Sequence, residues 1–599
     1  MRRFEHSLVI SSLLALGCSG GLSDEGPGGL APVDTGAPST VVPGASSQPL
    51  GGATSPSPAA SVPTPGGAAS SPITVGSSTV TPPPPPKPAS ACMDGVPGTS
   101  QIPRLTNSQY SRTVYDLLET FDPGLLAAEQ VGDITQSIWT GYNASADALA
   151  LTVMGDAALK AKFLKCTPTG DGTECLKSTV KDFGRRAFRR PLTTEEIASF
   201  DKLLAKRAEV TKTNSVDEVA ELLLSSILKS PSFIQRAELA ETPGTTGTFK
   251  LSSHEVASRL SYMLWGSMPD PTLDAAADAN ALQTPAQILE QAKRMAADPK
   301  AADIAKEFHR AYIELTGSSR WAQTAKDASF TNFSASVVPD MIAEEEMLFD
   351  KIYTGGKSFQ DLLTTDEGYV TSRTAAIYGL ANPAQYGDTL TPVKLDASRP
   401  GFLTRVGFLA AYSKQTRTSP ILRGAFVTKR VIGVDPGPPD PNVLDGEAPN
   451  SPELDTNRKR VAAQTAAVAC ATCHAKFVNP SGFVLEAFDT TGASQSVERD
   501  TKAAIETNAE LVFSVTGAGV PVTGPADMMA KIAASPEAQR FYASKWVGYA
   551  YNRTLTGPDV CTVDALTAKV TAGGYSIQNL LADLTQTNVF LTRAIEATP

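Results

Sequence analysis

The stretch Cys470-Ala471-Thr472-Cys473-His474 places two cysteines and a histidine within five residues, in a chain of 599 residues that has only seven cysteines and four histidines. Cys-x-x-Cys-His is the attachment signal for a c-type haem. Two intervening residues let one helical turn present both sulfur atoms to the haem vinyl groups, and the adjacent imidazole then lies under the iron. The motif predicts one covalent haem c, bound through Cys470 and Cys473, with His474 as the proximal ligand of the iron.

The segments around this motif are predicted to be helical. One helix is expected from Arg458 to Ala475, ending at Asn479-Pro480-Ser481-Gly482. The haem motif then lies on the last turn of that helix. Another helix is expected from Arg423 to Gly433, followed by an extended connection at Pro436–Pro441.

Helix-start signals recur along the rest of the chain, and apolar residues follow them at helical spacing. A further helix is expected from Ser145 to Lys165, and residues 525–593 are again expected to be helical. The pattern predicts a mainly α, multidomain fold. The signals are the capping-box pairs Thr106 with Gln109, Thr193 with Glu196, Ser215 with Glu218 and Ser252 with Glu255, and the Thr284-Pro285-Ala286-Gln287 start.

The N-terminus has the pattern of an export signal. Met1-Arg2-Arg3 is positively charged, and Leu8–Leu16 is an apolar run too short to span a bilayer. Cys18 follows at the place where a bacterial lipoprotein is acylated, so we expect a lipid anchor there. Ser19 favours the outer membrane, facing the periplasm or the cell surface. The alternative is an ordinary cleaved signal peptide with a chance cysteine.

Residues 19–91 are rich in Gly, Pro, Ser, Thr and Ala and cannot bury a core, so we expect a disordered tether between the anchor and the globular part. The net charge of −10 argues against nucleic acid as a partner, because such proteins usually present a basic face. The sequence does not identify a redox partner or a small-molecule substrate.

Cys166 and Cys175 bracket a short polar turn. In an exported chain they predict a disulfide that closes this loop. Two free thiols are the alternative.

Several charged or titratable residues are expected to have structural roles only. His254 and His309 are isolated and should be structural. The basic run Phe183–Leu192 should be a solvated helix end. Glu344-Glu345-Glu346 should form a solvated face, since adjacent helical side chains point apart.

Taken together, several segments resemble the large exported proteins of planctomycetes and myxobacteria that combine a planctomycete-type cytochrome c domain with associated helical domains. The matching segments are Arg104–Leu118, Phe183–Leu192, Ala257–Asp270, Thr418–Gly424, Cys470–Asp489 and Gly524–Arg553. The resemblance implies a small cytochrome c-like haem module near the C-terminal third, and it supports haem attachment at Cys470, Cys473 and His474. The family has no agreed activity.

The resemblance and the composition together divide the chain into seven segments. The first two are a lipoprotein-type signal peptide (1–18) and the tether (19–91). Three helical domains follow at 100–165, 166–240 and 248–383, and the third of them contains the signature Ala257–Asp270. The last two are a cytochrome c-like domain (398–498) and a C-terminal helical domain (505–599).

The chain also departs from its relatives. Many relatives have a histidine where this chain has Gln464, so one possible distal haem ligand is absent. Met528 and Met529 lie downstream at a separation typical of a cytochrome distal ligand. Relatives often carry a cysteine near Arg540, which this chain lacks, so Cys92 and Cys561 remain as a possible pair.

Several functions remain open at this point. The first is electron transfer or periplasmic redox chemistry by an exported haem c protein. The second is a haem-dependent oxidase or peroxidase-like enzyme, which the missing histidine at Gln464 would fit. The third is a surface scaffold or polysaccharide-binding protein with structural haem. Zinc is a minor alternative for the motif, because a closed zinc site needs four ligands and only three are local. A thiol-redox role for the two cysteines would leave the histidine unused.

Overall fold

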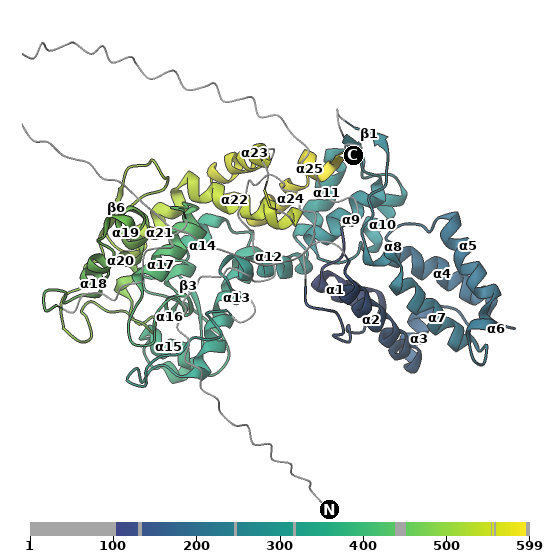
Figure 1. Cartoon of the computed structure of the whole chain (residues 1–599), viewed down its shortest axis with the longest axis horizontal. Coiled ribbons are helices and arrows are strands. Elements are labelled where there is room, and N and C mark those ends of the chain that lie inside the picture. Colours follow the sequence, from purple (N-terminus) through teal and green to yellow (C-terminus); the bar gives the residue numbers. More distant parts are fainter. Residues whose placement is uncertain are drawn as a thin grey trace, which may run out of the picture. The chain divides into compact units, whose positions relative to one another are not determined.

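The computed structural model describes residues 103–594, with gaps at residues 130–133, 245–247, 316–318 and 438–450 and at positions 553, 556 and 558. Its secondary structure is mainly helical, as the sequence predicts (Figure 1). The signal segment, Cys18, the tether at 19–91 and Cys92 lie outside the described residues. Within the described ranges, no helix is both long enough and apolar enough to cross a membrane.

The N-terminal helices pack around a hydrophobic core of their own. The single helix expected at 145–165 is two helices, because the Asp156 side chain accepts hydrogen bonds from the Ala158 and Leu159 N–H groups and so starts a new helix. These elements are α1 (Asn107–Leu118), α2 (Gln136–Gly155), α3 (Ala157–Leu164), α4 (Thr173–Phe188), α5 (Thr194–Ala205), α6 (Arg207–Val210), α7 (Val216–Lys229) and α8 (Pro231–Ile234).

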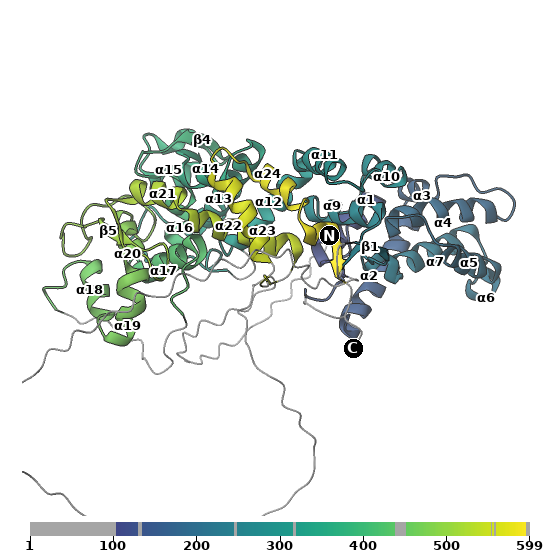
Figure 2. The ribbon, with the colours of Figure 1, turned by 90° about the horizontal axis from the view of Figure 1, so that it is seen from above.

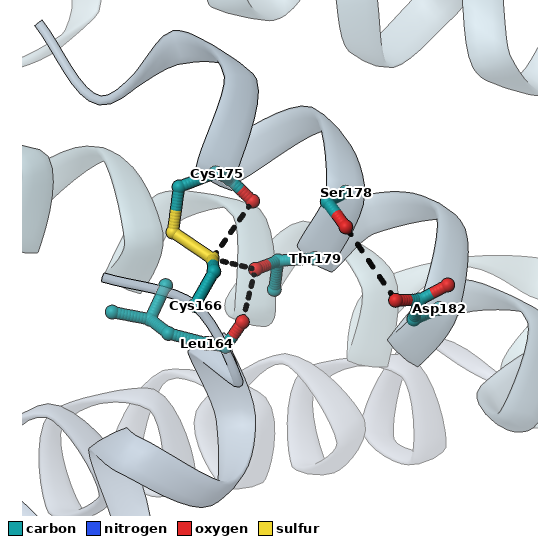
Figure 3. Close-up of a disulfide and its surroundings, with 6 residues drawn as sticks. All are labelled: Leu164, Cys166, Cys175, Ser178, Thr179 and Asp182. Atoms are coloured by element: carbon teal, nitrogen blue, oxygen red, sulfur yellow. Dashed lines mark hydrogen bonds between the residues drawn. A yellow bond between two sulfur atoms is a disulfide. The ribbon is translucent and has the colours of Figure 1, made fainter. Parts of the chain in front are cut away.

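A disulfide joins Cys166, just after α3, to Cys175 in the first turn of α4 (Figure 3). Next to it the Thr179 hydroxyl donates to the Leu164 carbonyl oxygen at 2.9 Å, which ties α4 to the end of α3. The link therefore holds two consecutive helices at the turn between them.

The basic run that ends α4 is not fully solvated. Arg189 is buried, and its guanidinium donates to the carbonyl oxygens of Ser232, Phe233 and Gln235. The prediction of a solvated helix end is wrong for this residue, because the end of α8 and the residue after it need donors for their carbonyl groups.

The central helices contribute to the largest hydrophobic core. His309 on α12 is fully buried there, with Nδ1 2.7 Å from the Ala305 carbonyl oxygen and Nε2 2.9 Å from the Tyr542 hydroxyl oxygen. The elements are α9 (Ser253–Leu264), α10 (Pro271–Asp278), α11 (Pro285–Ala296), α12 (Pro299–Tyr312), η1 (Ala335–Val337), α13 (Val338–Thr354), α14 (Phe359–Thr364), α15 (Ser372–Tyr378) and η2 (Pro383–Tyr386).

Two of the three glutamates on α13 are fully buried. The predicted solvated face is wrong for Glu344 and Glu345, because α13 packs against α16 (Val406–Ala411) and strand β3 (Glu367–Val370) on that side. The Tyr378 hydroxyl donates to Glu344 Oε1 at 2.8 Å, whereas neither oxygen of Glu345 has a hydrogen-bond partner in the described structure. Burial raises the pKa of Glu344 to about 7, although the nearby Arg405 opposes the shift.

The strands form three small antiparallel sheets. β2 (Thr248–Lys250) lies between β1 (Thr242–Pro243) and β7 (Thr592–Ala594) and pairs with both, so the end of the described chain returns to the start of the central helices. The other two sheets are β3 (Glu367–Val370) with β4 (Thr391–Lys394) and β5 (Ala509–Leu511) with β6 (Val520–Val522).

The C-terminal part is helical, as expected, although Thr592 and Arg593 at the end of the expected range 525–593 lie in strand β7. Helices α22 and α23 lie side by side (Figure 2). Cys561 on α23 is disulfide-bonded, and its expected partner Cys92 lies outside the described residues. The helices are α21 (Pro525–Ala534), α22 (Pro536–Tyr551), α23 (Asp559–Thr571), α24 (Ile577–Leu584) and α25 (Asn588–Leu591).

Candidate haem site

The Cys-x-x-Cys-His motif lies on a helix that changes its winding. α18 (Asn457–Gln464) ends before the motif, and α19 (Val468–Cys473) carries both cysteines. A π-helical turn, η5 (His474–Val478), follows and leads into α20 (Asn479–Val484). Figure 2 shows α18, α19 and α20 grouped together. Single π turns inside helices occur frequently at functional sites.

The single helix expected from Arg458 to Ala475 is therefore wrong in two respects. The chain breaks between α18 and α19, where the Thr465 hydroxyl folds back to donate to the Val461 carbonyl oxygen at 2.8 Å. The helix also continues through Asn479-Pro480, because Pro480 lies in the first turn of α20.

Both thiols of the motif are unpaired and half-buried. Cys473 Sγ lies 3.5 Å from the Pro436 carbonyl oxygen, on the segment that precedes the motif. Val468, two residues before Cys470, is 86% exposed. Cys470 and Cys473 are three residues apart on α19 and share a face of the helix, whereas Val468 does not share that face.

The imidazole of His474 is held at one nitrogen. Its Nδ1 lies 3.3 Å from Asn479 Oδ1, and the Asn479 amide Nδ2 donates to Thr465 Oγ1 at 2.8 Å. The other nitrogen of His474, Nε2, makes no hydrogen bond with any described residue. A histidine that ligates a metal through one nitrogen usually donates the other N–H to a fixed acceptor. The site therefore fits a haem whose iron would be bound through His474 Nε2.

The helix after the motif is fixed by a close crossing with α17 (Pro420–Phe426). A Cβ atom on Gly424 would overlap the Val478 carbonyl oxygen, and one on Gly482 would overlap the Pro420 carbonyl oxygen. Only glycine lets the two backbones approach this closely. The Thr428 hydroxyl, on η4 (Val427–Ile432), donates to the Phe477 carbonyl oxygen at 2.8 Å and holds the π turn.

A buried ion pair lies beneath this crossing. Arg423 on α17 is fully buried and makes five hydrogen bonds, which go to the carbonyl oxygens of Leu485, Phe488, Leu409 and Asp489 and to Ser413 Oγ. Its guanidinium lies 3.7 Å from Glu486 Oε1. Glu486 lies on η6 (Leu485–Ala487), and burial raises the pKa of its carboxyl.

Arg423 and Glu486 lie within segments that the sequence singled out, but their burial and their pairing were not predicted. Arg423 was named only as the start of the expected helix Arg423–Gly433 and within the segment Thr418–Gly424. The signal that could have found the pair is an arginine and a glutamate inside otherwise apolar runs, because charged residues are rarely buried unless they are paired.

The remaining candidate residues lie on other elements than His474. Met528 and Met529 are fully buried in the largest core. Gln464 is the last residue of α18, and His254 lies on α9 with its Nε2 3.1 Å from an Asp278 carboxylate oxygen. Among the described residues no three His, Cys, Asp or Glu side chains are arranged to hold one metal ion.

Four family models match the chain. They are Protein of unknown function (DUF1595) at residues 175–238, (DUF1592) at 251–380, (DUF1588) at 399–498 and (DUF1585) at 518–590. The match at 399–498 is to the cytochrome-type model PSCyt3 and contains the whole Cys-x-x-Cys-His segment. No curated protein and no solved structure matches the chain.

Together the four matches cover more than half of the 599 residues, in the order that the sequence resemblance implies. All four models are planctomycete cytochrome c-associated families. The chain is thus a cytochrome c-related multidomain protein, and it belongs to the planctomycete-type family that combines a cytochrome c domain with associated helical domains of unknown function.

Proposed function

We propose that this protein carries one covalent haem c at Cys470, Cys473 and His474 and acts in electron transfer or periplasmic redox chemistry. The observation that carries the proposal is the arrangement of the motif: two unpaired thiols on α19 beside an imidazole that is held at Nδ1 and open at Nε2. A haem bound there would supply a one-electron couple at the iron.

The chain's own residues would hold the group in distinct ways. Cys470 and Cys473 would form the two thioether bonds, and His474 would ligate the iron through Nε2. The Gly424 and Gly482 crossing would keep η5 and α20 in place.

The test is to produce the chain in a host that attaches haem c, and then to record the pyridine haemochrome spectrum and stain for haem after denaturing electrophoresis. We expect haem that survives denaturation in the wild type and none in the double variant Cys470→Ala/Cys473→Ala. The matched control, Cys166→Ala/Cys175→Ala, removes the other described pair of cysteines and should keep the haem. Haem retained by the first variant would overturn the proposal.

A haem-dependent oxidase or peroxidase-like enzyme is the second candidate. It is favoured by the composition of residues 399–498, which contain no methionine and only one histidine, His474. With no second strong ligand from this segment, the sixth position of the iron would be open to a small molecule. A five-coordinate, high-spin spectrum that changes on adding carbon monoxide or cyanide would favour the enzyme over the electron carrier.

We further propose that the protein is exported and held at the outer membrane by a lipid on Cys18, with residues 19–91 as the tether. The support is the N-terminal pattern of charge, apolar run and cysteine. Mass spectrometry of the mature N-terminus tests this, because an acylated peptide that begins at Cys18 is expected. A mature chain that begins elsewhere and carries no lipid would contradict it.

A further inference from the structure

The acceptor that holds His474 is a side-chain amide with a fixed orientation. Three hydrogen bonds follow one another from the imidazole to the backbone: His474 Nδ1 with Asn479 Oδ1, Asn479 Nδ2 to Thr465 Oγ1, and the Thr465 hydroxyl to the Val461 carbonyl oxygen. The middle two residues are buried, with Asn479 2% and Thr465 5% exposed. We call this series the His474 relay.

The His474 relay determines where the imidazole proton lies. The Thr465 hydroxyl gives its only hydrogen to Val461, so towards Asn479 it can only accept. The NH₂ group of Asn479 must therefore face Thr465, and its carbonyl Oδ1 must face His474. An amide oxygen only accepts, so the imidazole carries its proton on Nδ1. The lone pair of the neutral ring then lies on Nε2, the atom that would ligate the iron.

The π turn is what brings the two side chains together. Asn479 comes five residues after His474, and in an α-helix side chains at that separation do not lie on the same face. Here the Asn479 N–H bonds the His474 carbonyl oxygen, which is the i→i+5 bond of a π turn. The wider turn places residue 479 under residue 474.

We propose that Asn479, held by Thr465, is the positioning residue of the haem ligand, and that its uncharged acceptor sets the reduction potential of the iron. The inference rests on the proposed haem at this site. A neutral amide accepts the Nδ1 proton weakly, so the imidazole donates little additional electron density to the iron. A stronger acceptor would favour the ferric state and lower the potential, and a missing acceptor would raise it.

The test compares the midpoint potentials of the full-length holoprotein variants by spectroelectrochemical titration. Asn479→Asp, with its stronger acceptor, should lower the potential, and Asn479→Leu should raise it. We expect each shift to approach a tenfold change in the redox equilibrium constant, which is about 59 mV for a one-electron couple. Because Asp also adds a negative charge, which lowers the potential by itself, these two shifts are judged together with those of the uncharged Thr465 variants.

Thr465 supplies a matched pair that leaves the ligand and its acceptor unchanged. Thr465→Val has nearly the same shape but no hydroxyl, so the amide is released and the potential should rise. Thr465→Ser keeps the hydroxyl and should keep the wild-type potential. Ser481→Ala, on the same helix as Asn479, is the control outside the His474 relay, because among the described residues the Ser481 hydroxyl hydrogen-bonds the carbonyl oxygens of Gly424 and Val478 and no member of the relay.

The two proposals fail in distinguishable ways. If the wild type carries no covalent haem in the pyridine haemochrome assay, the proposed function fails. The role of Asn479 is overturned if the wild type and both Thr465 variants carry haem with equal midpoint potentials, and if every Asn479 variant that retains haem also has the wild-type potential. In that case the haem site itself still stands.

Discussion

Arg423 and Glu486 form an ion pair of 3.7 Å between side chains that are 0% and 2% exposed, directly under the helix that follows the haem motif. Glu486 Oε2 also accepts from the Thr418 hydroxyl at 2.7 Å and from the Asn457 amide at 3.0 Å. The pair thereby connects α17 and η6 to the start of α18, so three segments of the haem-motif region depend on it.

Replacing Arg423 by methionine should destabilise the protein strongly. The variant leaves Glu486 without its cation and removes the donor from four backbone carbonyl groups. Breaking a buried pair from one side typically costs about 3–5 kcal/mol. Chemical denaturation monitored by circular dichroism measures the loss. Lys569→Met breaks the half-exposed pair with Asp583 and should cost about 0–1 kcal/mol; equal losses in the two variants would contradict this account.

Gly424→Ala tests the crossing of α17 with α20. The new methyl group would overlap the Val478 carbonyl oxygen, which is backbone and cannot move aside cheaply. We expect a loss of stability of about 1–3 kcal/mol, the usual range for overpacking, together with reduced haem attachment. Gly155→Ala, at the end of α2, is the control because its Cβ would meet no atom within 4 Å. A Gly424→Ala variant as stable as wild type would refute the close crossing.

The Cys166–Cys175 link should contribute to stability without affecting the haem. The loop it closes is short, with a sequence separation of nine, so the chain-entropy model gives about 2–3 kcal/mol. Cys166→Ala/Cys175→Ala should lose this much in chemical denaturation and show an unchanged haem spectrum. A changed haem spectrum would mean that the N-terminal helices influence the haem site.

Much of the helical fold could be predicted from the sequence. The capping boxes at Thr106, Thr193 and Ser252 all form, and the helix expected to start at Thr284-Pro285 does so, because these signals depend on residues within one turn of each other. Ser215 caps α7, but Glu218 accepts from Thr213 instead of closing a box. The Cys-x-x-Cys-His segment was found for the same reason, since its chemistry is local.

The features that were missed depend on contacts between distant segments. The π turn at His474–Val478 coincides with the Gly424 crossing and the Thr428 hydrogen bond, which no local pattern encodes. Asn479 was predicted to end a helix, although it lies within one and holds His474. The domain limits and the roles of Cys18 and residues 19–91 remain predictions.

The buried carboxyls on α13 predict a pH dependence of stability. Burial raises the pKa of Glu344 from its usual value of 4.5 to about 7. Burial and the neighbouring Glu344 raise the pKa of Glu345 well above its usual value. At pH values between a carboxyl's pKa in the unfolded state and its higher pKa in the folded state, the native state binds more protons than the unfolded state. The free energy of unfolding therefore falls as pH rises through this range. For Glu344 this decline should run from about pH 4.5 to about pH 7.

Glu344→Gln should flatten that decline, because a residue that does not titrate replaces the one that must stay protonated in the folded state. The shift from 4.5 to about 7 corresponds to a stability change on the order of 3 kcal/mol across the window, at about 1.4 kcal/mol for each pKa unit. Urea denaturation at half-unit steps of pH measures the slope. Glu346→Gln, at the half-buried next position, leaves both buried carboxyls in place and should keep the wild-type slope. If Glu344→Gln and wild type lose stability in parallel between pH 5 and 7, Glu344 is not the group that takes up the proton.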